Sequence, residues 1–338
     1  MNVRRRHISA VALTAVAALG FGTLTACSSD SAAAGDTGSF DVVASFYPMA
    51  FLAERIGGEH VHVTSLTQPG QEPHDLEISA RQTAQLEEAD AALYLKGLQP
   101  SVDEAIGQSP IATKIDAAEL TTLEEHGTEA GHDEEHGDEH GTEAGHADEH
   151  GDEHAHEDEH GHDHEGGDPH IWLDPVRYAE VAEGVGKAFQ KADPDHAADY
   201  RKNTAALVKD LKALDEKFRT GLANRTTDVF VTTHAAFGYL AERYGLTEEA
   251  ISGLDPDTEP SGARVKELQK IAKEDGVTTV FYETLVSDKT AKTLAGDTGL
   301  RTDVLDPVEG ITDRSRGEDY FQVMEANLTA LRTALGAR

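Results

Sequence analysis

Residues 119–167 constrain the fold of this 338-residue chain more than any other stretch. From Glu119 to Asp168 there are 20 acidic residues, and 11 of the chain's 18 histidines lie between His126 and His164. The stretch has no apolar periodicity and almost no large apolar side chain, so it cannot form a core. We predict a solvated, disordered loop over 119–167, and the fold must therefore be built from the regions on either side.

The acidic stretch also accounts for most of the chain's charge. The formal net charge is −34, and no lysine or arginine occurs between Lys114 and Arg177. More than half of the net negative charge therefore belongs to one segment, and the rest is an ordinary acidic protein. The sequence has no basic patch of the kind that binds nucleic acid, so we expect no nucleic-acid partner.

Short apolar runs alternate with longer amphipathic ones on both sides of the loop. This alternation predicts parallel sheets in two α/β lobes. Pro194 opens a helical pattern through Ala223 whose length suits a rigid connection between lobes. We therefore expect an N-terminal lobe over 40–193, which contains the loop, a connecting helix over 194–223, and a C-terminal lobe over 224–338. The predicted strands are 40–46, 61–67, 91–95, 228–233, 277–283 and 302–306, and the remaining helices are 48–56, 79–88, 178–191, 235–244, 262–276, 288–298 and 320–335.

The first residues have the features of an export signal. Three arginines, Arg4 to Arg6, precede an apolar run from Ile8 to Leu24. This pattern predicts a secretory signal over 1–26. The run ends in Leu-Thr-Ala-Cys, which resembles a bacterial lipobox and implies a lipid on Cys27, the only cysteine of the chain. With a polar tether over 27–39, the mature protein should sit on the extracytoplasmic face of the cell membrane, held by its lipid anchor.

Three histidines occupy the places where ligands of open α/β sheets are expected. His74 lies in "QPGQEPHDLEIS", His170 in "GDPHIWLDP" and His234 in "VFVTTHAAFGYL". Neutral imidazole is the commonest metal ligand, and zinc usually takes four nitrogen, sulfur or oxygen ligands. The fourth could be Glu283, Asp306, Glu309 or water, and spacing alone does not choose among them.

One match to a zinc-binding motif does not indicate a zinc site. His156 to His160 matches H-E-x-x-H, the zinc-protease signature, but that motif needs a stable helix with both histidines on one face. Here it lies among Gly, Asp and Glu repeats without an apolar face. A zinc hydrolase is also disfavoured because no general-base motif accompanies the candidate ligands, and we predict that the protein is not an enzyme.

From Phe40 to the C-terminus the chain resembles the metal-binding solute-binding proteins of bacterial ABC transporters, in their zinc-uptake branch. The phrases that carry the resemblance occur in the family's order: "SFYPMAFLAERIGG", "PGQEPHDLEIS", "DPHIWLDP", "THAAFGYLAERYGL", "GLDPDTEPS" and "VLDPVEG". A histidine-rich acidic insertion before "DPHIW" is itself typical of this branch.

The resemblance implies a site and a function. It places zinc in a cleft between two lobes, with His74, His170 and His234 as ligands and Glu309 as the fourth. Because manganese and iron members usually carry glutamate at the third position, His234 favours zinc. The expected protein is a monomer that captures Zn²⁺ and delivers it to an ABC permease with a cytoplasmic ATPase, while the histidine-rich loop collects zinc.

Two alternatives remain from the sequence. One is a zinc buffer without a permease, and the other is a manganese-specific transport component. Because ligand imidazoles must be neutral, zinc affinity should fall as the pH drops below about 6.

Overall fold

The computed structural model describes residues 39–126 and 167–338. The predicted signal, Cys27 and most of the predicted histidine-rich loop lie outside these residues. Within the described ranges, no helix is both long enough and apolar enough to cross a membrane.

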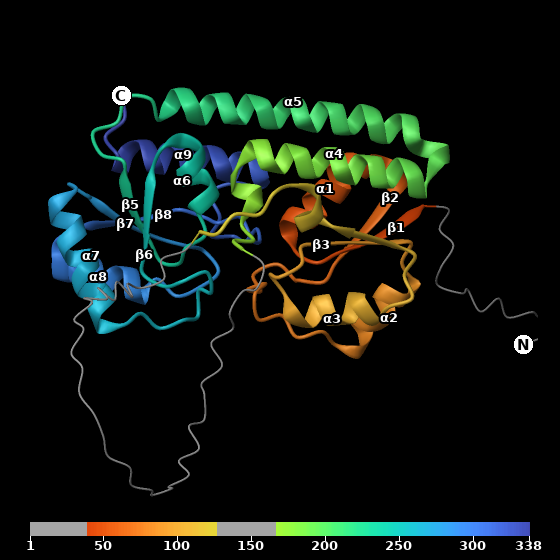
Figure 1. Cartoon of the computed structure of the whole chain (residues 1–338), viewed down its shortest axis with the longest axis horizontal. Helices are drawn as coiled ribbons and strands as arrows, with labels where there is room; N and C mark the ends of the chain where they lie inside the picture. Colours follow the sequence, from red (N-terminus) through yellow and green to blue (C-terminus); the bar gives the residue numbers. More distant parts are fainter. Residues whose placement is uncertain (1–38, 127–166) are drawn as a thin grey trace, which may run out of the picture. The chain divides into compact units, whose positions relative to one another are not determined.

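The N-terminal lobe is built on a parallel four-stranded sheet in the order β2-β1-β3-β4. Helices on the sheet's faces connect successive strands, as parallel pairing requires (Figure 1). The elements are β1 (Phe40–Ala44), α1 (Tyr47–Gly57), β2 (Val61–Ser65), α2 (Ala80–Glu88), β3 (Ala91–Tyr94), α3 (Pro100–Gln108) and β4 (Thr113–Asp116).

The C-terminal lobe repeats this topology with strand order β6-β5-β7-β8, again all parallel. Its elements are β5 (Val229–Thr232), α6 (Gly238–Tyr244), β6 (Thr247–Ala250), α7 (Gly262–Glu274), β7 (Thr279–Tyr282), α8 (Lys289–Thr298), β8 (Arg301–Val304) and α9 (Tyr320–Ala334). The prediction of two parallel-sheet α/β lobes is therefore confirmed.

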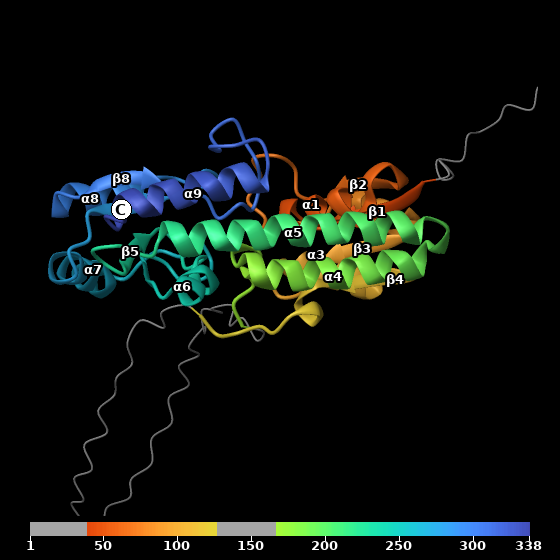
Figure 2. The same ribbon diagram turned by 90° about the horizontal axis from the view of Figure 1, so that it is seen from above.

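Two long helices, α4 (Pro175–Ala192) and α5 (Ala197–Gly221), separate the two sheets in the sequence. They lie side by side in space (Figures 1 and 2). A Cβ atom at Gly186 of α4 would lie 2.2 Å from the Thr204 hydroxyl of α5, so only glycine permits this close approach. Pro194 begins a short 3₁₀ turn (Pro194–His196), and α5 therefore begins three residues later than the sequence pattern suggests.

Helix α5 contacts both lobes directly. Near its start, the Asn203 amide donates to the Ile56 carbonyl of α1 at 3.0 Å. Near its end, Lys217 pairs with Glu325 of α9 at 2.5 Å. The connection predicted between the lobes is thus one continuous helix that is fixed at both ends.

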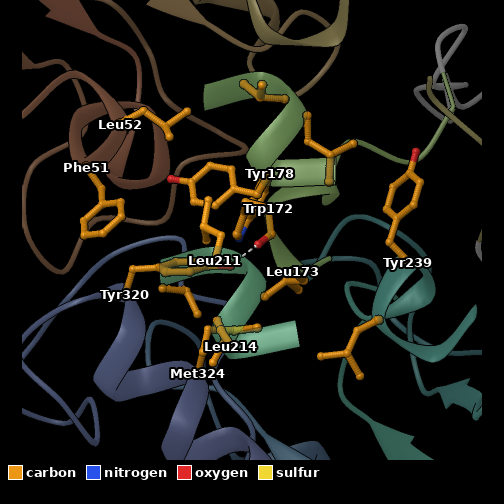
Figure 3. Close-up of a cluster of buried hydrophobic side chains, with 14 of the residues drawn as sticks. Phe51, Leu52, Trp172, Leu173, Tyr178, Leu211, Leu214, Tyr239, Tyr320 and Met324 are labelled. Carbon is orange, nitrogen blue, oxygen red and sulfur yellow. Dashed lines mark hydrogen bonds between the residues drawn. The ribbon is translucent and has the colours of Figure 1, made fainter. Parts of the chain in front are cut away.

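A single buried cluster of apolar side chains draws on both lobes (Figure 3). The Trp172 indole donates to the Pro307 carbonyl at 2.7 Å, and the Tyr320 hydroxyl donates to the Trp172 carbonyl at 2.6 Å. Burying each large apolar side chain contributes roughly 1.5–3 kcal/mol to stability. These contacts join the segment around Trp172, which follows His170, to the C-terminal lobe.

The prediction of a disordered loop is wrong for residues 119–126, because contacts with α4 and α6 hold them in place. The Thr121 hydroxyl donates to Glu180 of α4 at 2.6 Å, and Glu124 and His126 contact residues of α6. The Tyr239 hydroxyl accepts from the Glu124 amide and donates to the Asp168 carbonyl, each at 2.8 Å. The Asp168 amide donates to the Glu124 carbonyl, also at 2.8 Å. One tyrosine therefore holds together the two described ends that flank residues 127–166.

Candidate metal centre

Four side chains from segments far apart in the sequence meet between the two lobes. His74 lies in the connection from β2 to α2, and His170 lies directly before a 3₁₀ turn (Ile171–Leu173). His234 follows β5 by two residues, and Glu309 lies in the segment after β8. Parallel strands present their carboxyl ends at one edge of a sheet, and this geometry brings His234 and Glu309 together. We call these four residues the inner cluster.

The inner cluster has the dimensions of a metal site. Oε1 of Glu309 lies 3.3 Å from Nε2 of His74, 3.4 Å from Nε2 of His170 and 3.6 Å from Nε2 of His234. One ligand atom from each of the four residues lies within 4.8 Å of all the others. A tetrahedron with zinc bonds of about 2.0–2.2 Å has edges of roughly 3.3–3.6 Å. The three carboxylate–imidazole distances therefore equal the edge lengths expected for ligands in a tetrahedron around zinc.

All four inner-cluster side chains are almost fully buried. The exposed fraction is 6% for His74 and 1% or less for His170, His234 and Glu309. Nε2 of His170, Nε2 of His234 and Oε2 of Glu309 have no hydrogen-bond partner in the described residues. Because buried polar atoms are normally paired, these atoms point to a ligand that the polypeptide does not supply.

Two further carboxylates orient the imidazoles from behind. Oδ1 of Asp168 lies 2.7 Å from Nδ1 of His170, and Oε1 of Glu283 lies 2.7 Å from Nδ1 of His234. A carboxylate on one ring nitrogen fixes the tautomer and aims the other nitrogen at a metal. Sequence reasoning missed Asp168; its place two residues before a candidate ligand was the available signal.

The three candidates for the fourth ligand occupy different positions. Glu283 accepts from Nδ1 of His234 at 2.7 Å and from the Thr233 hydroxyl at 2.6 Å. Asp306 accepts from the Val308 amide at 2.8 Å and from the Thr284 hydroxyl at 2.9 Å. Glu309 alone of the three reaches the histidine Nε2 atoms.

The backbone before Glu309 is strained. Val308 has φ +59°, the only positive φ outside glycine in the described residues. A β-branched residue rarely adopts this conformation, and such strain persists only where the surroundings enforce it. The bond from the Val308 amide to Asp306 and the complete burial of the Val308 side chain hold the turn that presents Glu309.

The electrostatics of the cluster favour protons on imidazole and a charge on the carboxylate. Burial lowers the pKa of His170, but the Asp168 carboxylate outweighs it and raises that pKa to about 9. Burial likewise opposes a charge on His234, yet Glu283 holds its pKa well above the usual value. For Glu309, burial raises the pKa, but the neighbouring imidazoles hold it well below the ordinary value. Metal binding must therefore displace protons from this site.

Glu72 is a further carboxylate at the edge of the cluster. Oε1 of Glu72 is 4.0 Å from Nε2 of His74 and has no hydrogen-bond partner in the described residues. Burial raises the pKa of Glu72 to about 7. No motif or spacing distinguishes Glu72 from the other acidic residues of its loop.

Fold and site together define a class: a two-lobed α/β protein with a buried cage of three imidazoles and one carboxylate between its lobes. Residues 42–334 match the family described as "Zinc-uptake complex component A periplasmic", and the chain belongs to that family.

Similarity to individual proteins supports the same assignment. The zinc-binding lipoprotein AdcA of Streptococcus pneumoniae serotype 4 is 36% identical over 315 residues, which cover 91% of this chain but only 58% of AdcA. The chain thus spans little more than half of that relative. The high-affinity zinc uptake system protein ZnuA of Bacillus subtilis is 35% identical over 300 residues, which cover 87% of each protein.

A solved structure extends the comparison to the fold. The Zn(II)-bound ZnuA-like domain of Streptococcus pneumoniae AdcA superposes with a TM-score of 0.67 at 31% identity, covering 88% of this chain and 99% of that domain. The family and these relatives are zinc-uptake or zinc-binding proteins, which confirms the prediction that the chain is not an enzyme.

Proposed function

We propose that this protein is the extracytoplasmic zinc-capturing component of an ABC importer. In this proposal Zn²⁺ is the cargo, and its ligands are His74, His170, His234 and Glu309. The observation that carries the proposal is the buried inner cluster, in which three imidazole Nε2 atoms surround one carboxylate at tetrahedral spacing. The zinc-binding relatives support the choice of metal.

The ligand chemistry also favours zinc over manganese. Imidazole suits zinc, copper and nickel, whereas manganese prefers carboxylate, carbonyl and water oxygens. Three of the four proposed ligands are imidazoles, and the cage supplies one carboxylate. Asp168 and Glu283 act behind His170 and His234 and strengthen both imidazoles as ligands.

Calorimetry of the mature full-length chain tests the proposed site, with a strong chelator present to suppress weak zinc binding elsewhere. The informative variant is Glu309→Gln, which keeps the shape of the side chain and removes its negative charge. The matched control is Glu77→Gln, because Glu77 is exposed and lies only three residues from His74. We expect one tight zinc ion in wild type and control, and an affinity at least tenfold lower in Glu309→Gln. Equal affinities would remove Glu309 from the ligand set.

Delivery to a permease is the second part of the proposal. The loaded protein, lipid-anchored through Cys27 and acting as a monomer, docks on a membrane permease whose cytoplasmic ATPase drives import. Zinc-limited growth of a strain that depends on this gene tests delivery. Growth that is restored only when the permease is present supports import. Restoration without the permease would favour the zinc-buffer alternative.

The histidine-rich segment is proposed to collect zinc and raise its concentration near the inner cluster. A deletion that tests this role should remove residues 127–166 and keep 119–126, because Glu124 is held by Tyr239 and Asp168. Total zinc bound per chain should fall, while the tight site remains. Loss of the tight site on deletion would show that the segment is not accessory.

A further inference from the structure

His126, the first histidine of the histidine-rich stretch, is docked in the structure rather than free. Nδ1 of His126 lies 3.0 Å from Oδ2 of Asp168. The ring of Tyr239 lies edge-on to the imidazole, with centroids 4.4 Å apart. A Cβ atom at Gly238 would lie 2.4 Å from Cβ of His126, so the missing side chain at the start of α6 makes room for it. The docking leaves Nε2 as the nitrogen that faces outward.

Two carboxylates face this outward nitrogen. Nε2 of His126 lies 3.4 Å from Oε2 of Glu242 on α6. One ligand atom each from Glu124, His126 and Glu242 lies within 4.8 Å of the others. We call these three residues the outer cluster. An imidazole nitrogen and two carboxylates at this spacing form a ligand set that zinc accepts.

Arg177 is the cation already present beside the outer cluster. Its guanidinium contacts the Glu124 carboxylate and lies 4.0 Å from Glu242. It is also held from other sides by the Thr122 carbonyl at 2.6 Å and by the ring of Tyr239 at 4.8 Å. With a neutral imidazole, Glu124 and Glu242 carry two negative charges against the one positive charge of Arg177, which also lies 3.6 Å from the Asp174 carboxylate. Asp168 adds a further negative charge beside His126. The cluster can therefore accept a divalent cation without first displacing Arg177 from its remaining partners.

We propose that Glu124, His126 and Glu242 form a second zinc site at the base of the histidine-rich segment. This site shares the Asp168 carboxylate with the inner cluster, because Oδ2 of Asp168 contacts His126 and Oδ1 contacts His170. It has one imidazole where the inner cluster has three, and Glu242 is 56% exposed. Its zinc therefore binds more weakly and exchanges faster than zinc in the inner cluster.

The test is chemical footprinting of individual histidines in the mature full-length chain. Diethyl pyrocarbonate modifies accessible imidazole nitrogens, and mass spectrometry reports the labelling rate of each histidine as zinc is titrated. Variants Glu242→Gln and Glu125→Gln form a matched pair: both remove one exposed carboxylate, but Glu125 is not part of the cluster. His62, which is 68% exposed, reports the activity of the reagent.

In wild type and Glu125→Gln, zinc should slow the labelling of His126 at least fivefold, at zinc concentrations above those that fill the tight site. In Glu242→Gln, the zinc concentration for half-protection should rise at least tenfold. His126 labelling that is insensitive to zinc would overturn the second site. So would equal protection in Glu242→Gln and Glu125→Gln, because zinc held elsewhere in the segment would then be the cause.

The second site does not depend on the proposed function, and the two can fail separately. Chelator competition measures the tight site, whereas the footprint reports His126. Zinc protection of His126 in a chain without tight zinc would refute the inner cluster as the capture site and leave the outer cluster standing. A zinc-soaked crystal gives an independent reading, since an anomalous scattering peak should lie among Glu124, His126 and Glu242.

Discussion

The inner and outer clusters use the same side-chain chemistry in opposite environments. The inner cluster is almost fully buried, has three imidazoles and is backed by the carboxylates of Asp168 and Glu283. The outer cluster is partly exposed, has one imidazole and shares its carboxylates with Arg177. Asp168 is the only carboxylate that contacts a histidine of each cluster in the described residues. Burial and ligand identity, more than ligand spacing, separate a site that retains an ion from one that exchanges it.

The largest difference between the clusters should appear on removal of one imidazole from each. His170→Ala removes an inner ligand and should lower the affinity for the tight zinc by more than about a hundredfold, because even outer-shell changes at metal sites cost roughly 10–100-fold. His126→Ala should leave the tight affinity within about threefold. Chelator competition measures both. A similar loss in the two variants would mean that the clusters form one site.

The shared carboxylate offers the next largest effect. Asp168→Asn removes the charge that orients His170, and Glu283→Gln does the same behind His234. Each should lower the tight affinity by about 10–100-fold. Only Asp168→Asn should also weaken the zinc protection of His126, which is read from its labelling rate. An effect of Glu283→Gln on His126 would show that the coupling does not run through Asp168.

The pH dependence of tight binding should differ from that of ordinary histidines. The pKa of His170 is about 9 in the metal-free site, so zinc must displace a proton from it at neutral pH. Affinity should therefore decline as the pH falls below about 9, by up to roughly tenfold per unit for each proton displaced. The sequence alone placed this decline below about pH 6. Calorimetry in buffers of different ionisation enthalpy counts the protons released, and no release at pH 7.5 would contradict the raised pKa.

The last expected effect concerns stability without metal. Because the folded-state pKa of His170 lies above its unfolded value near 6.5, protonation stabilises the fold fully below pH 6.5, and this contribution is lost as the pH rises through about 9. The metal-free protein should lose about 1–3 kcal/mol of unfolding free energy over this range. Urea unfolding at pH 6.5 and 9 measures it, with zinc-loaded protein as the control. A metal-free protein that is equally stable at both values would mean that His170 is neutral throughout.

Much of the fold could be predicted because apolar runs mark the central strands. The elements that were missed have little apolar periodicity: β4 and β6 are edge strands with the sequences "TKID" and "TEEA", and α3 buries only Val102 and Ile106. Edge strands are often short and carry charged side chains, so these two show no apolar run. Periodicity does not record their pairing.

The candidate site was predictable to a different degree for each residue. His74 and His234 could be found because each follows a strand or turn, and His170 because of the phrase "GDPHIWLDP" around it. Glu283, Asp306 and Glu309 could not be separated by spacing, since all three lie at or beyond the ends of strands. Their roles depend on which way each carboxylate turns, and Val308, with its positive φ, sets that direction for Glu309. The role of Asp168 behind His170 could be suspected from its place two residues earlier, whereas its contact with His126 spans 42 positions in the sequence and no local pattern encodes it.

The hydrogen bond from Trp172 to Pro307 has a consequence for the speed of zinc exchange. It ties the segment that carries His170 to the segment that carries Glu309, and it is formed by the polypeptide alone. An arriving ion therefore meets a chelate that is already assembled, and little of its binding energy is spent on ordering the protein. The time needed for capture is then set by stripping water from the ion and by reaching a buried centre. By the same route in reverse, the ion can leave without breaking this indole–carbonyl contact, and the loss of its four ligands then sets the rate of release.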